Sequence, residues 1–309
     1  MTSLILAAGL TPAWQQILVF DSLRVGGVNR AREAHWCASG KVLNAGLALH
    51  FLGAQSLALA VVGGPHEDMI DREFTSLGVP HRWIRSESPT RVCTTILDRS
   101  TGIHTELVQN AQPIRPEELE QFVCAYEEEV GQARLAILIG SLPGGVPTAL
   151  YRSLMEKTRV PVILDASGPE LLAALPIRPF CVKPNREELA RTLGRTLNSD
   201  ADLREAMAHV NSLGAEWIVV SQGEKPLWAG SRGRIFTFGT SKIEAVNPIG
   251  SGDCLAAGIA FGIAGGMDML GAIRFGIAAA AENASMLLPA RLDPERVKGL
   301  AARIPVEPL

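Results

Sequence analysis

The chain has 309 residues, 47% of them hydrophobic, which is enough to bury a large core and argues against disorder. Its formal net charge of −3 and the absence of long Lys/Arg runs argue against a nucleic-acid binder. No stretch is apolar for long enough to span a bilayer, and residues 1–10 lack the basic region of a signal peptide, so we expect a cytoplasmic protein without a membrane partner. A small-molecule ligand is favoured.

The cysteines are scattered without the CxxC spacing of a zinc site. We therefore expect reduced, buried thiols and no disulfide framework. They are Cys37, Cys93, Cys124, Cys181 and Cys254.

Two segments in the first third of the chain contain extended, partly alternating stretches, at about residues 17–36 and 91–108. Residues 98–102 have the composition of a hairpin turn. We predict that the two segments form a small β lid, although ordinary edge strands would show the same pattern. Each carries a cation, Arg30 and Arg91, that would suit a cover over an anionic substrate.

Between these segments, Ser39-Gly40-Lys41-Val42-Leu43-Asn44 opens a predicted helix over residues 45–52. Lys41 and Asn44 are three residues apart and share a face, so they can contact a phosphate and a hydroxyl together. A lysine at a helix start is also commonly a solvated side chain. This motif therefore depends on support from others.

Short β-type runs then alternate with helical patterns, which predicts right-handed βαβ units and a mostly parallel sheet covered on both faces. Ligands of such sheets bind at the carboxyl ends of the strands. The pairs of segments are 57–62 with 68–77, 135–139 with 148–158, 160–164 with 170–174, and 180–182 with 187–193.

Polar or glycine-rich loops follow several of these strands. Residues 140–147, which include Ser141, and residues 165–168 would permit close approach of a ligand. In Lys183-Pro184-Asn185-Arg186-Glu187-Glu188, the lysine can neutralise phosphates, while Asn185 and Glu188 can hold the water shell of Mg²⁺. The same residues could simply cap a helix. Ser221-Gln222-Gly223 closes a further strand and offers a turn on which a nucleotide could lie.

The most informative stretch is Asn247-Pro248-Ile249-Gly250-Ser251-Gly252-Asp253, which precedes an apolar run over residues 254–264. It predicts a glycine-bearing turn that feeds a helix, with free amides and an aspartate in the first turn. Such amides can stabilise the charge on a transferring phosphoryl group, and the carboxylate can accept a proton from the attacking hydroxyl. An ordinary helix cap would have a similar composition.

In this order, the motifs resemble the ribokinase-like sugar kinases over nearly the whole chain. Within that family they are most similar to the phosphofructokinase B (PfkB) branch, which includes 1-phosphofructokinase and tagatose-6-phosphate kinase. The resemblance implies a single three-layer α/β domain over residues 1–309, with a mostly parallel central sheet and a β lid. It also implies ATP and Mg²⁺ as cofactors and a sugar phosphate as substrate.

The resemblance also implies roles for the nucleotide-side residues. Residues 247–253 are similar to the GxGD signature, so that Asp253 is the catalytic base and the Gly250, Ser251 and Gly252 amides belong to its anion hole. The KxNxxE-like segment places Lys183, Asn185 and Glu188 at the ATP phosphates, with water-coordinated Mg²⁺ beside Asn185 and Glu188. The SxG-like turn implies nucleotide contacts from Ser221 and Gly223, and Asn283 lies in the late helix that flanks the adenine in relatives.

On the acceptor side, Gly40, Lys41 and Asn44 resemble the GGKGxN signature, and Arg91 the arginine that holds the sugar phosphate together with that lysine. The departures from the family pattern fall here. Gln15, in Thr11-Pro12-Ala13-Trp14-Gln15, stands where this branch usually has a sugar-contacting aspartate. Two glycines of GGKGxN are replaced, by Ser39 and Val42, and Thr105-Glu106-Leu107-Val108 lacks the Asn expected after the Glu. The acceptor sugar is therefore not fixed by the motifs.

We predict a carbohydrate kinase that transfers the ATP γ-phosphoryl group to a hydroxyl of a phosphorylated ketose, of the fructose 1-phosphate, fructose 6-phosphate or tagatose 6-phosphate type. The alternatives are a non-catalytic nucleotide- or sugar-phosphate-binding protein, against which the intact Asp253 argues, and a kinase for an unphosphorylated sugar or nucleoside, against which Lys41 and Arg91 argue. Relatives often form homodimers through their lids. The alternation of Val92, Thr94 and Ile96 fits such a contact, and it fits a buried sheet face equally well.

Overall fold

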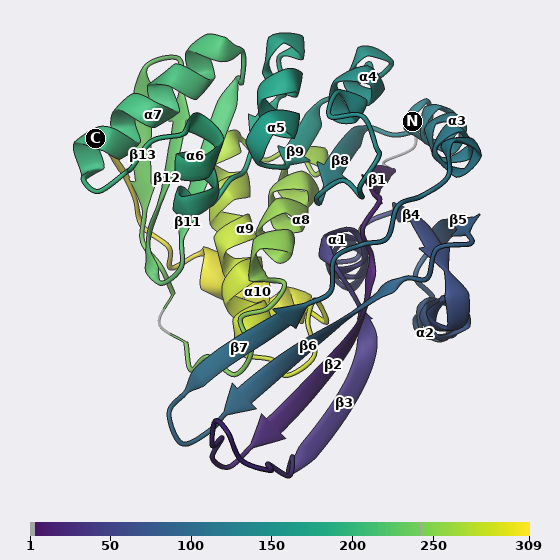
Figure 1. Ribbon diagram of the computed structural model, residues 1–309. Helices are drawn as coiled ribbons and strands as arrows, with labels where there is room; N and C mark the ends of the chain where they lie inside the picture. Colours follow the sequence, from purple (N-terminus) through teal and green to yellow (C-terminus); the bar gives the residue numbers. More distant parts are fainter. Residues whose placement is uncertain (1–3, 242) are drawn as a thin grey trace.

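The computed structural model describes residues 4–241 and 243–309 (Figure 1). The strands of the main sheet in this part of the chain are β1 (Ile5–Gly9), β4 (Ser56–Gly63), β5 (His81–Ser86), β8 (Leu135–Ile139), β9 (Val162–Asp165), β10 (Cys181–Val182), β11 (Trp217–Gln222), β12 (Lys225–Ser231), β13 (Arg234–Phe238) and β14 (Val306–Pro308). Their order across the sheet is β14-β13-β12-β11-β10-β9-β8-β1-β4-β5. From β11 to β5 neighbouring strands are parallel, whereas β12, β13 and β14 join antiparallel at one edge. The predicted mostly parallel sheet is confirmed.

Helices cover both faces of this sheet and make the fold three-layered (Figure 1). One face packs against α1 (Lys41–Phe51), α2 (Glu67–Leu77), α8 (Ser251–Ala264), α9 (Met269–Ala284) and α10 (Pro294–Ala301). The other packs against α3 (Pro116–Val130), α4 (Leu150–Glu156), α5 (Gly168–Ala174), α6 (Arg186–Leu193) and α7 (Asp200–Leu213). Short 3-10 turns span Gly64–His66 and Leu175–Ile177.

The central strands are apolar throughout because both of their faces are covered. In β8, Leu135, Ile137 and Ile139 belong to the core under α8, whereas Ala136 and Leu138 belong to the core on the opposite face. The same period of two divides β1. Each strand therefore contributes to two separate cores, and its carboxyl end is held firmly at one edge of the sheet.

A second sheet projects from one end of the three-layer body (Figure 1). Its strands are β3 (Glu33–Ser39), β2 (Ala13–Phe20), β6 (Arg91–Asp98) and β7 (Ile103–Val108), in that order across the sheet. The hairpin turn predicted over 98–102 connects β6 to β7. This sheet is the predicted lid, but its first part extends beyond residues 17–36 at both ends, since the register of β2 with β3 runs from the Ala13–Ser39 pair to the Val19–Glu33 pair.

One side of the lid sheet faces the body. Ile17, Val19, Cys37 and Leu97 are buried there and pack against the loop that follows α9. The opposite side carries Trp14 and Trp36, whose rings stack with centroids 6.3 Å apart, and Trp36 is 46% exposed. The lid thus has an inner face turned to the body and an outer face rich in apolar side chains.

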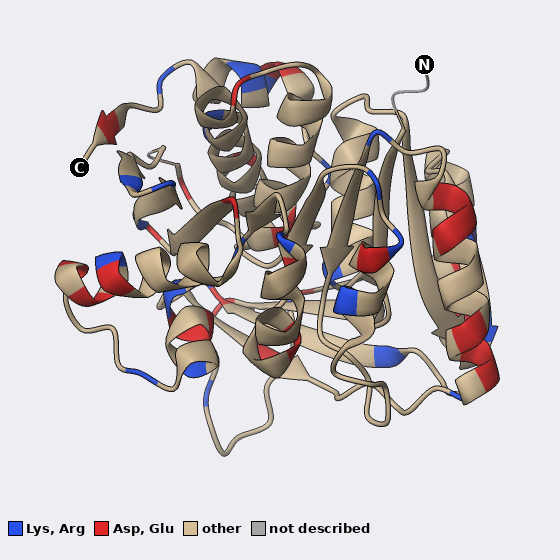
Figure 2. Cartoon of the chain, turned by 90° about the horizontal axis from the view of Figure 1, so that it is seen from above, with Lys and Arg blue, Asp and Glu red and all other residues tan. Residues whose placement is uncertain are grey.

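The prediction that all the cysteines are buried is wrong for Cys124, which is exposed. Cys124 lies on the solvent side of α3, whose buried side is formed by Phe122, Ala125 and Tyr126. Figure 2 shows that acidic residues are frequent along this helix, while Lys and Arg are distributed over many elements in that view. Within the described residues, no helix is both long and apolar enough to cross a membrane.

Candidate active site

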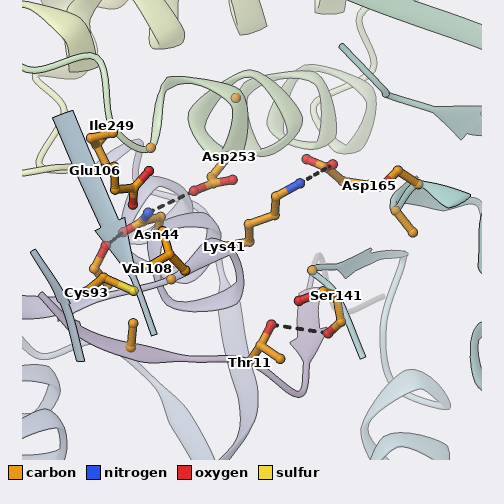
Figure 3. A pocket seen from close by; sticks show the side chains of 18 of the residues that line it. Thr11, Lys41, Asn44, Cys93, Glu106, Val108, Ser141, Asp165, Ile249 and Asp253 are labelled. Atoms are coloured by element: carbon orange, nitrogen blue, oxygen red, sulfur yellow. Dashed lines mark hydrogen bonds and ion pairs between the residues drawn. The ribbon is translucent and has the colours of Figure 1, made fainter. Parts of the chain in front are cut away.

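A cavity of about 510 Å³ lies where the carboxyl ends of β1, β8, β9 and β10 meet the inner face of the lid (Figure 3). Residues far apart in the sequence line it together. Those for which the sequence predicts a role in the site are Gln15, Gly40, Lys41, Asn44, Arg91, Ser141, Lys183, Asn185, Glu188, Ser221, Gly250, Gly252 and Asp253. Gly223 instead lines an adjoining groove of about 590 Å³, which shares Asn185 and Ser221 with the cavity. Ser251 and Asn283 line neither.

The start of α8 presents backbone amides to the cavity. Gly250 precedes the helix with φ 84°, in the left-handed region that favours glycine. The Ser251 amide donates to the Pro248 carbonyl (3.1 Å). The Gly252 and Asp253 amides have no hydrogen-bond partner among the described residues, as is usual in the first turn of a helix. They are therefore available to an anion.

Asn283 holds this turn in place from α9. It is fully buried, and its amide nitrogen donates to the Ile249 carbonyl and the Ser251 hydroxyl, both at 2.9 Å. Its oxygen accepts from the Ala290 amide (2.7 Å). Both polar atoms of the side chain thus form hydrogen bonds within the protein, and these bonds position the turn. The predicted nucleotide contact of Asn283 stays a prediction.

Asp253 lies in the first turn of α8 and is 6% exposed. Its carboxylate accepts a hydrogen bond from the Asn44 amide (2.8 Å), which in turn accepts one from Ser39 (3.1 Å). Burial raises the pKa of Asp253 to about 7, and the charge of Asp165 adds to this, while Lys41 and the Asn44 hydrogen bond oppose it. A carboxyl group with this pKa can exchange a proton near neutral pH.

An ion-pair network joins the two halves of the cavity through Asp165, the last residue of β9. Its two oxygens contact the ammonium groups of Lys41 (3.0 Å) and Lys183 (2.9 Å), and Lys41 also lies 3.5 Å from Glu188. Burial alone would raise the pKa of Asp165, but the two lysines hold it below its usual value. Conversely, burial would lower the pKa of Lys41, and Asp165, Glu188 and Asp253 together raise it. Lys41 is therefore charged at neutral pH.

Asn185 and Glu188 form the start of α6 as well as part of the cavity wall. The Asn185 side chain accepts from the Glu188 amide, and the Glu188 carboxylate accepts from the Asn185 amide, both at 2.8 Å. This capping box occupies one carboxylate oxygen of Glu188 and leaves the other facing Lys41. The helix-cap interpretation and the ligand interpretation of this segment are thus compatible. The remaining oxygen fits an outer-shell role toward a hydrated divalent cation.

Gly40 lets the start of α1 approach the segment after β1. Its φ is 87°, and a Cβ atom there would lie 2.8 Å from the Ala13 nitrogen and 2.9 Å from the Thr11 oxygen. Val42, which replaces a glycine of the resembled signature, lies within α1 and is buried. Among the described residues, the non-glycine positions with positive φ are Arg178, Arg232 and Ala290, so Val42 needs no unusual backbone.

The acceptor end of the cavity is formed by the lid and the loops after β1 and β8. The Arg91 guanidinium donates to the backbone carbonyls of Thr11 (3.2 Å), Pro12 (3.3 Å) and Gln109 (3.4 Å), which ties the lid to the body. Gln15 is buried, and its amide nitrogen donates to the Thr95 hydroxyl (2.8 Å). Only the oxygen of the Gln15 side chain is left to face a ligand.

Several residues that build this site carry little or no signal of their own in the sequence. Asp165 was predicted only as part of a strand-end loop. Like Lys183, it is a charged residue at the carboxyl end of a buried strand, which could have indicated a role in the site. Tyr151 donates to the Gly140 carbonyl (2.7 Å) and has no local signal in the sequence. Thr11 donates to the Ser141 carbonyl (3.2 Å), and the sequence pattern singled it out only as part of the stretch that contains Gln15. Glu106 was noted only for its neighbour. It extends from β7 into the cavity (Figure 3).

Solved structures share this fold at low sequence identity. A possible 1-phosphofructokinase from Thermotoga maritima matches with a TM-score of 0.91 and 22% identity over 99% of each chain. Phosphofructokinase-2 from Escherichia coli, in complex with substrates and products, matches with a TM-score of 0.86 and 23% identity over 98% of this chain and 99% of that chain. Arabidopsis thaliana ribokinase, complexed with ribose and ATP, matches with a TM-score of 0.75 and 19% identity over 97% of this chain and 99% of that chain. The three-layer body with its lid is thus a ribokinase-like fold.

The family model described as pfkB family carbohydrate kinase matches residues 14–288. The match includes the lid, the cavity and the α8 turn, and thus most of the chain. With a kinase family, ATP is implied as the phosphoryl donor. The chain belongs to the pfkB family of carbohydrate kinases, and it is a phosphotransferase with an alcohol group as acceptor.

Proposed function

We propose that the protein transfers the γ-phosphoryl group of ATP to a hydroxyl of a phosphorylated ketose, with Asp253 as the base. The observation that carries this proposal is the buried Asp253 carboxylate, with a pKa of about 7, beside the unpartnered amides of Gly252 and Asp253. A proton acceptor and an anion-stabilising turn are the two groups that such a transfer requires from the protein.

Each half of the cavity has a distinct part in the reaction. On the nucleotide side, the Lys183 ammonium lies close to Gly252, since a Cβ atom on Gly252 would be 3.5 Å from it, and so adds positive charge where the transferred phosphoryl group would lie. Mg²⁺, when bound, neutralises phosphate charge, and Asn185 and Glu188 would hold its water shell. Asn44 orients Asp253 toward the acceptor hydroxyl, whose proton Asp253 takes as the new bond forms.

Positive charge at the acceptor end supports a phosphorylated substrate. Lys41 and Arg91 both line the cavity, and each guanidinium or ammonium retains donors beyond its protein contacts. A solved structure of E. coli phosphofructokinase-2 is described as being in complex with fructose-6-phosphate. Fructose 1-phosphate, fructose 6-phosphate and tagatose 6-phosphate are therefore the acceptors that we propose to test first.

The test measures Mg²⁺-dependent ADP release from ATP with each of these sugars and, as unphosphorylated comparisons, with fructose, ribose and adenosine. Asp253→Asn serves as the blank. Turnover with one phosphorylated ketose that is lost in the blank would support the proposal. Turnover only with an unphosphorylated acceptor, or ATP binding without turnover on any acceptor, would refute it in favour of one of the alternatives.

We further propose that the outer face of the lid binds a second copy of this chain. Trp14, Leu18, Trp36, Val92 and Ile96 lie on this face by strand register, and Leu107 on β7 continues it, 55% exposed. A partly exposed apolar sheet face of this kind is typical of an interface. One of the similar structures is described as a tetrameric form of E. coli phosphofructokinase-2.

A further inference from the structure

Glu106 is an acidic side chain on the lid side of the cavity, where Arg91 and Lys41 supply positive charge. It lines the same cavity as Lys41, Asn44 and Arg91, and Figure 3 shows it extending from β7 into that space. No hydrogen bond or ion pair joins its carboxylate to another of the described residues. Glu106 is exposed in the single chain, and its partial desolvation at the cavity raises its pKa, which the positive charge of Arg91 opposes. Its carboxylate is therefore accessible to a ligand that enters the cavity.

Strand register fixes the direction in which Glu106 points. It lies opposite Thr95 on β6, and Thr95 is fully buried on the inner face of the lid. Gln15 donates to the Thr95 hydroxyl from the next strand. Gln15, Thr95 and Glu106 thus form a polar row across the inner face, and in this row Glu106 alone carries a charge.

The chemistry of this row is complementary to hydroxyl groups. The Gln15 nitrogen is occupied by Thr95, so the row offers mainly acceptors, which are the Gln15 oxygen and both Glu106 oxygens. A carboxylate accepts hydrogen bonds from hydroxyls with short, charge-assisted geometry, and it repels a second anionic group. Lys41 and Arg91 would hold the one phosphate of the acceptor at the cationic part of the cavity.

We propose that Glu106 is a specificity-determining residue that accepts hydrogen bonds from hydroxyls of the acceptor and selects an uncharged polyhydroxyl body carrying one phosphate. This inference rests on the proposed function. It adds that sugar acids and other acceptors with a second anionic group beside the phosphate are disfavoured, and it assigns this discrimination to a lid residue.

The test compares wild-type protein with Glu106→Gln, which keeps the shape and removes the charge, and with Thr105→Ala, the adjacent change on the other face of β7. Two inhibitors form a matched pair, since glucitol 6-phosphate carries an alcohol where 6-phosphogluconate carries a carboxylate. We expect Glu106→Gln to raise the KM of the phosphorylated ketose by about tenfold or more. The preference for glucitol 6-phosphate should fall several-fold, while the KM of MgATP and the melting temperature stay unchanged.

An unchanged KM and an unchanged inhibitor ratio in Glu106→Gln would overturn the assignment. Equal losses in Glu106→Gln and Thr105→Ala would also overturn it, because they would indicate a general disturbance of the lid. If the wild type binds these ligands without turnover, the proposed function fails, and calorimetric dissociation constants of the same pair still decide the role of Glu106. Failure of the wild type to bind any of the phosphorylated sugars would overturn both.

Discussion

The Asp253 carboxylate combines a buried position with a neighbouring pair of positive and negative charges, and this combination sets its pKa near 7. A base in this range is ionised in a useful fraction of molecules at neutral pH and remains basic enough to accept a proton. Asn44 supplies the hydrogen bond that fixes its orientation. These properties suit the proposed role of Asp253 in proton transfer, and the cations nearby suit phosphate groups.

Replacement of Asp253 by Asn should lower kcat roughly 100- to 10,000-fold, the usual contribution of a general base. The KM of ATP should stay close to the wild-type value, because Asp253 acts in the transition state rather than in nucleotide binding. Steady-state kinetics with saturating acceptor measure this. A kcat within a few-fold of wild type would contradict the assigned role.

The pH dependence follows from the same group. Because the ionised form of Asp253 is the active one, kcat/KM should rise with pH and level off above about pH 7. Phosphates on the substrate titrate near pH 6 and contribute an inflection of their own, so the residual activity of Asp253→Asn is the control. The inflection near 7 should be absent from that variant. Its persistence there would assign it to another group.

The raised pKa of Asp253 also links stability to pH. Below its unfolded-state value the group is protonated in both states; from there up to about pH 7 the folded state keeps a proton that the unfolded state has lost. The free energy of unfolding therefore falls through this range, by at most about 1.4 kcal/mol per pH unit from this group. Urea unfolding of wild type and Asp253→Asn from pH 5 to 8 should show a steeper fall in the wild type, since Glu73 and Glu282, whose pKa values are also raised, are present in both. Parallel curves would contradict it.

At the residue scale, the sequence predicted the residues whose motifs are contiguous. Lys183, Asn185, Glu188 and Asp253 each lie at a strand end or helix start, where local pattern and local geometry coincide, and the structure places them together in one cavity. Asp165 was not named, because its importance comes from two lysines that are 124 and 18 positions away in the chain. Contacts of this kind depend on the tertiary fold, so they produce no recognisable residue spacing in the sequence.

At the scale of elements, the turn before α8 depends on side chains from α9. Asn283 donates to two groups of the turn and accepts from the loop that follows α9. Without it, the Ile249 carbonyl and the Ala290 amide would lose their partners in a buried environment. The amides that we propose to face the phosphoryl group are thus held in place by a residue that does not line the cavity.

Asn283→Ala should therefore lower the free energy of unfolding by about 2–4 kcal/mol and also reduce kcat. Asn211→Ala is a matched control, because its amide donates to the Ala215 and Gly230 carbonyls (2.9 and 3.5 Å) in a part of the fold away from the cavity. Urea unfolding and steady-state kinetics measure the two effects. The control should lose stability without a comparable loss of kcat; similar kcat values for both variants would show that the Asn283 contact does not support catalysis.

The elements themselves were largely predictable. Buried parallel strands are short and apolar, and the helical patterns that follow them begin within a few residues of the helices in the structure. The predicted limits of the lid were too narrow, because β2 and β3 continue as far as Ala13 and Ser39, which lie in the motifs that flank the predicted segment. The ends of half-exposed strands are harder to predict, because their hydrophobic pattern is weaker than that of strands covered on both faces.

At the scale of the whole molecule, the proposed dimer would make the lid a link between catalysis and assembly. Its inner face carries Gln15, Arg91 and Glu106, which line the cavity, and its outer face carries the stacked rings of Trp14 and Trp36. A partner bound to the outer face would fix the orientation of strands whose inner side chains contact the acceptor. The alternation of residues along the lid strands indicates which side chains share a face. It does not indicate which of the two faces is turned to the body.

Trp36→Glu should convert the proposed dimer to monomers, because it places a charge in the apolar outer face. Trp36 is 46% exposed in the single chain, so the folded monomer should tolerate the change. Sedimentation velocity over a range of concentrations measures the oligomeric state, and circular dichroism checks that the variant is folded. A wild-type protein that sediments as a monomer at every concentration would contradict the proposed interface.

The most direct test of the central claim follows the phosphate itself by ³¹P nuclear magnetic resonance, in a mixture of protein, MgATP and a phosphorylated ketose. We predict that the γ-phosphate signal of ATP is lost and that a product with two phosphomonoester resonances appears in equal amount with ADP. Asp253→Asn should leave the ATP signals unchanged over the same period. Release of inorganic phosphate without a new phosphomonoester, or no change in any signal with each of the three ketose phosphates, would contradict the account.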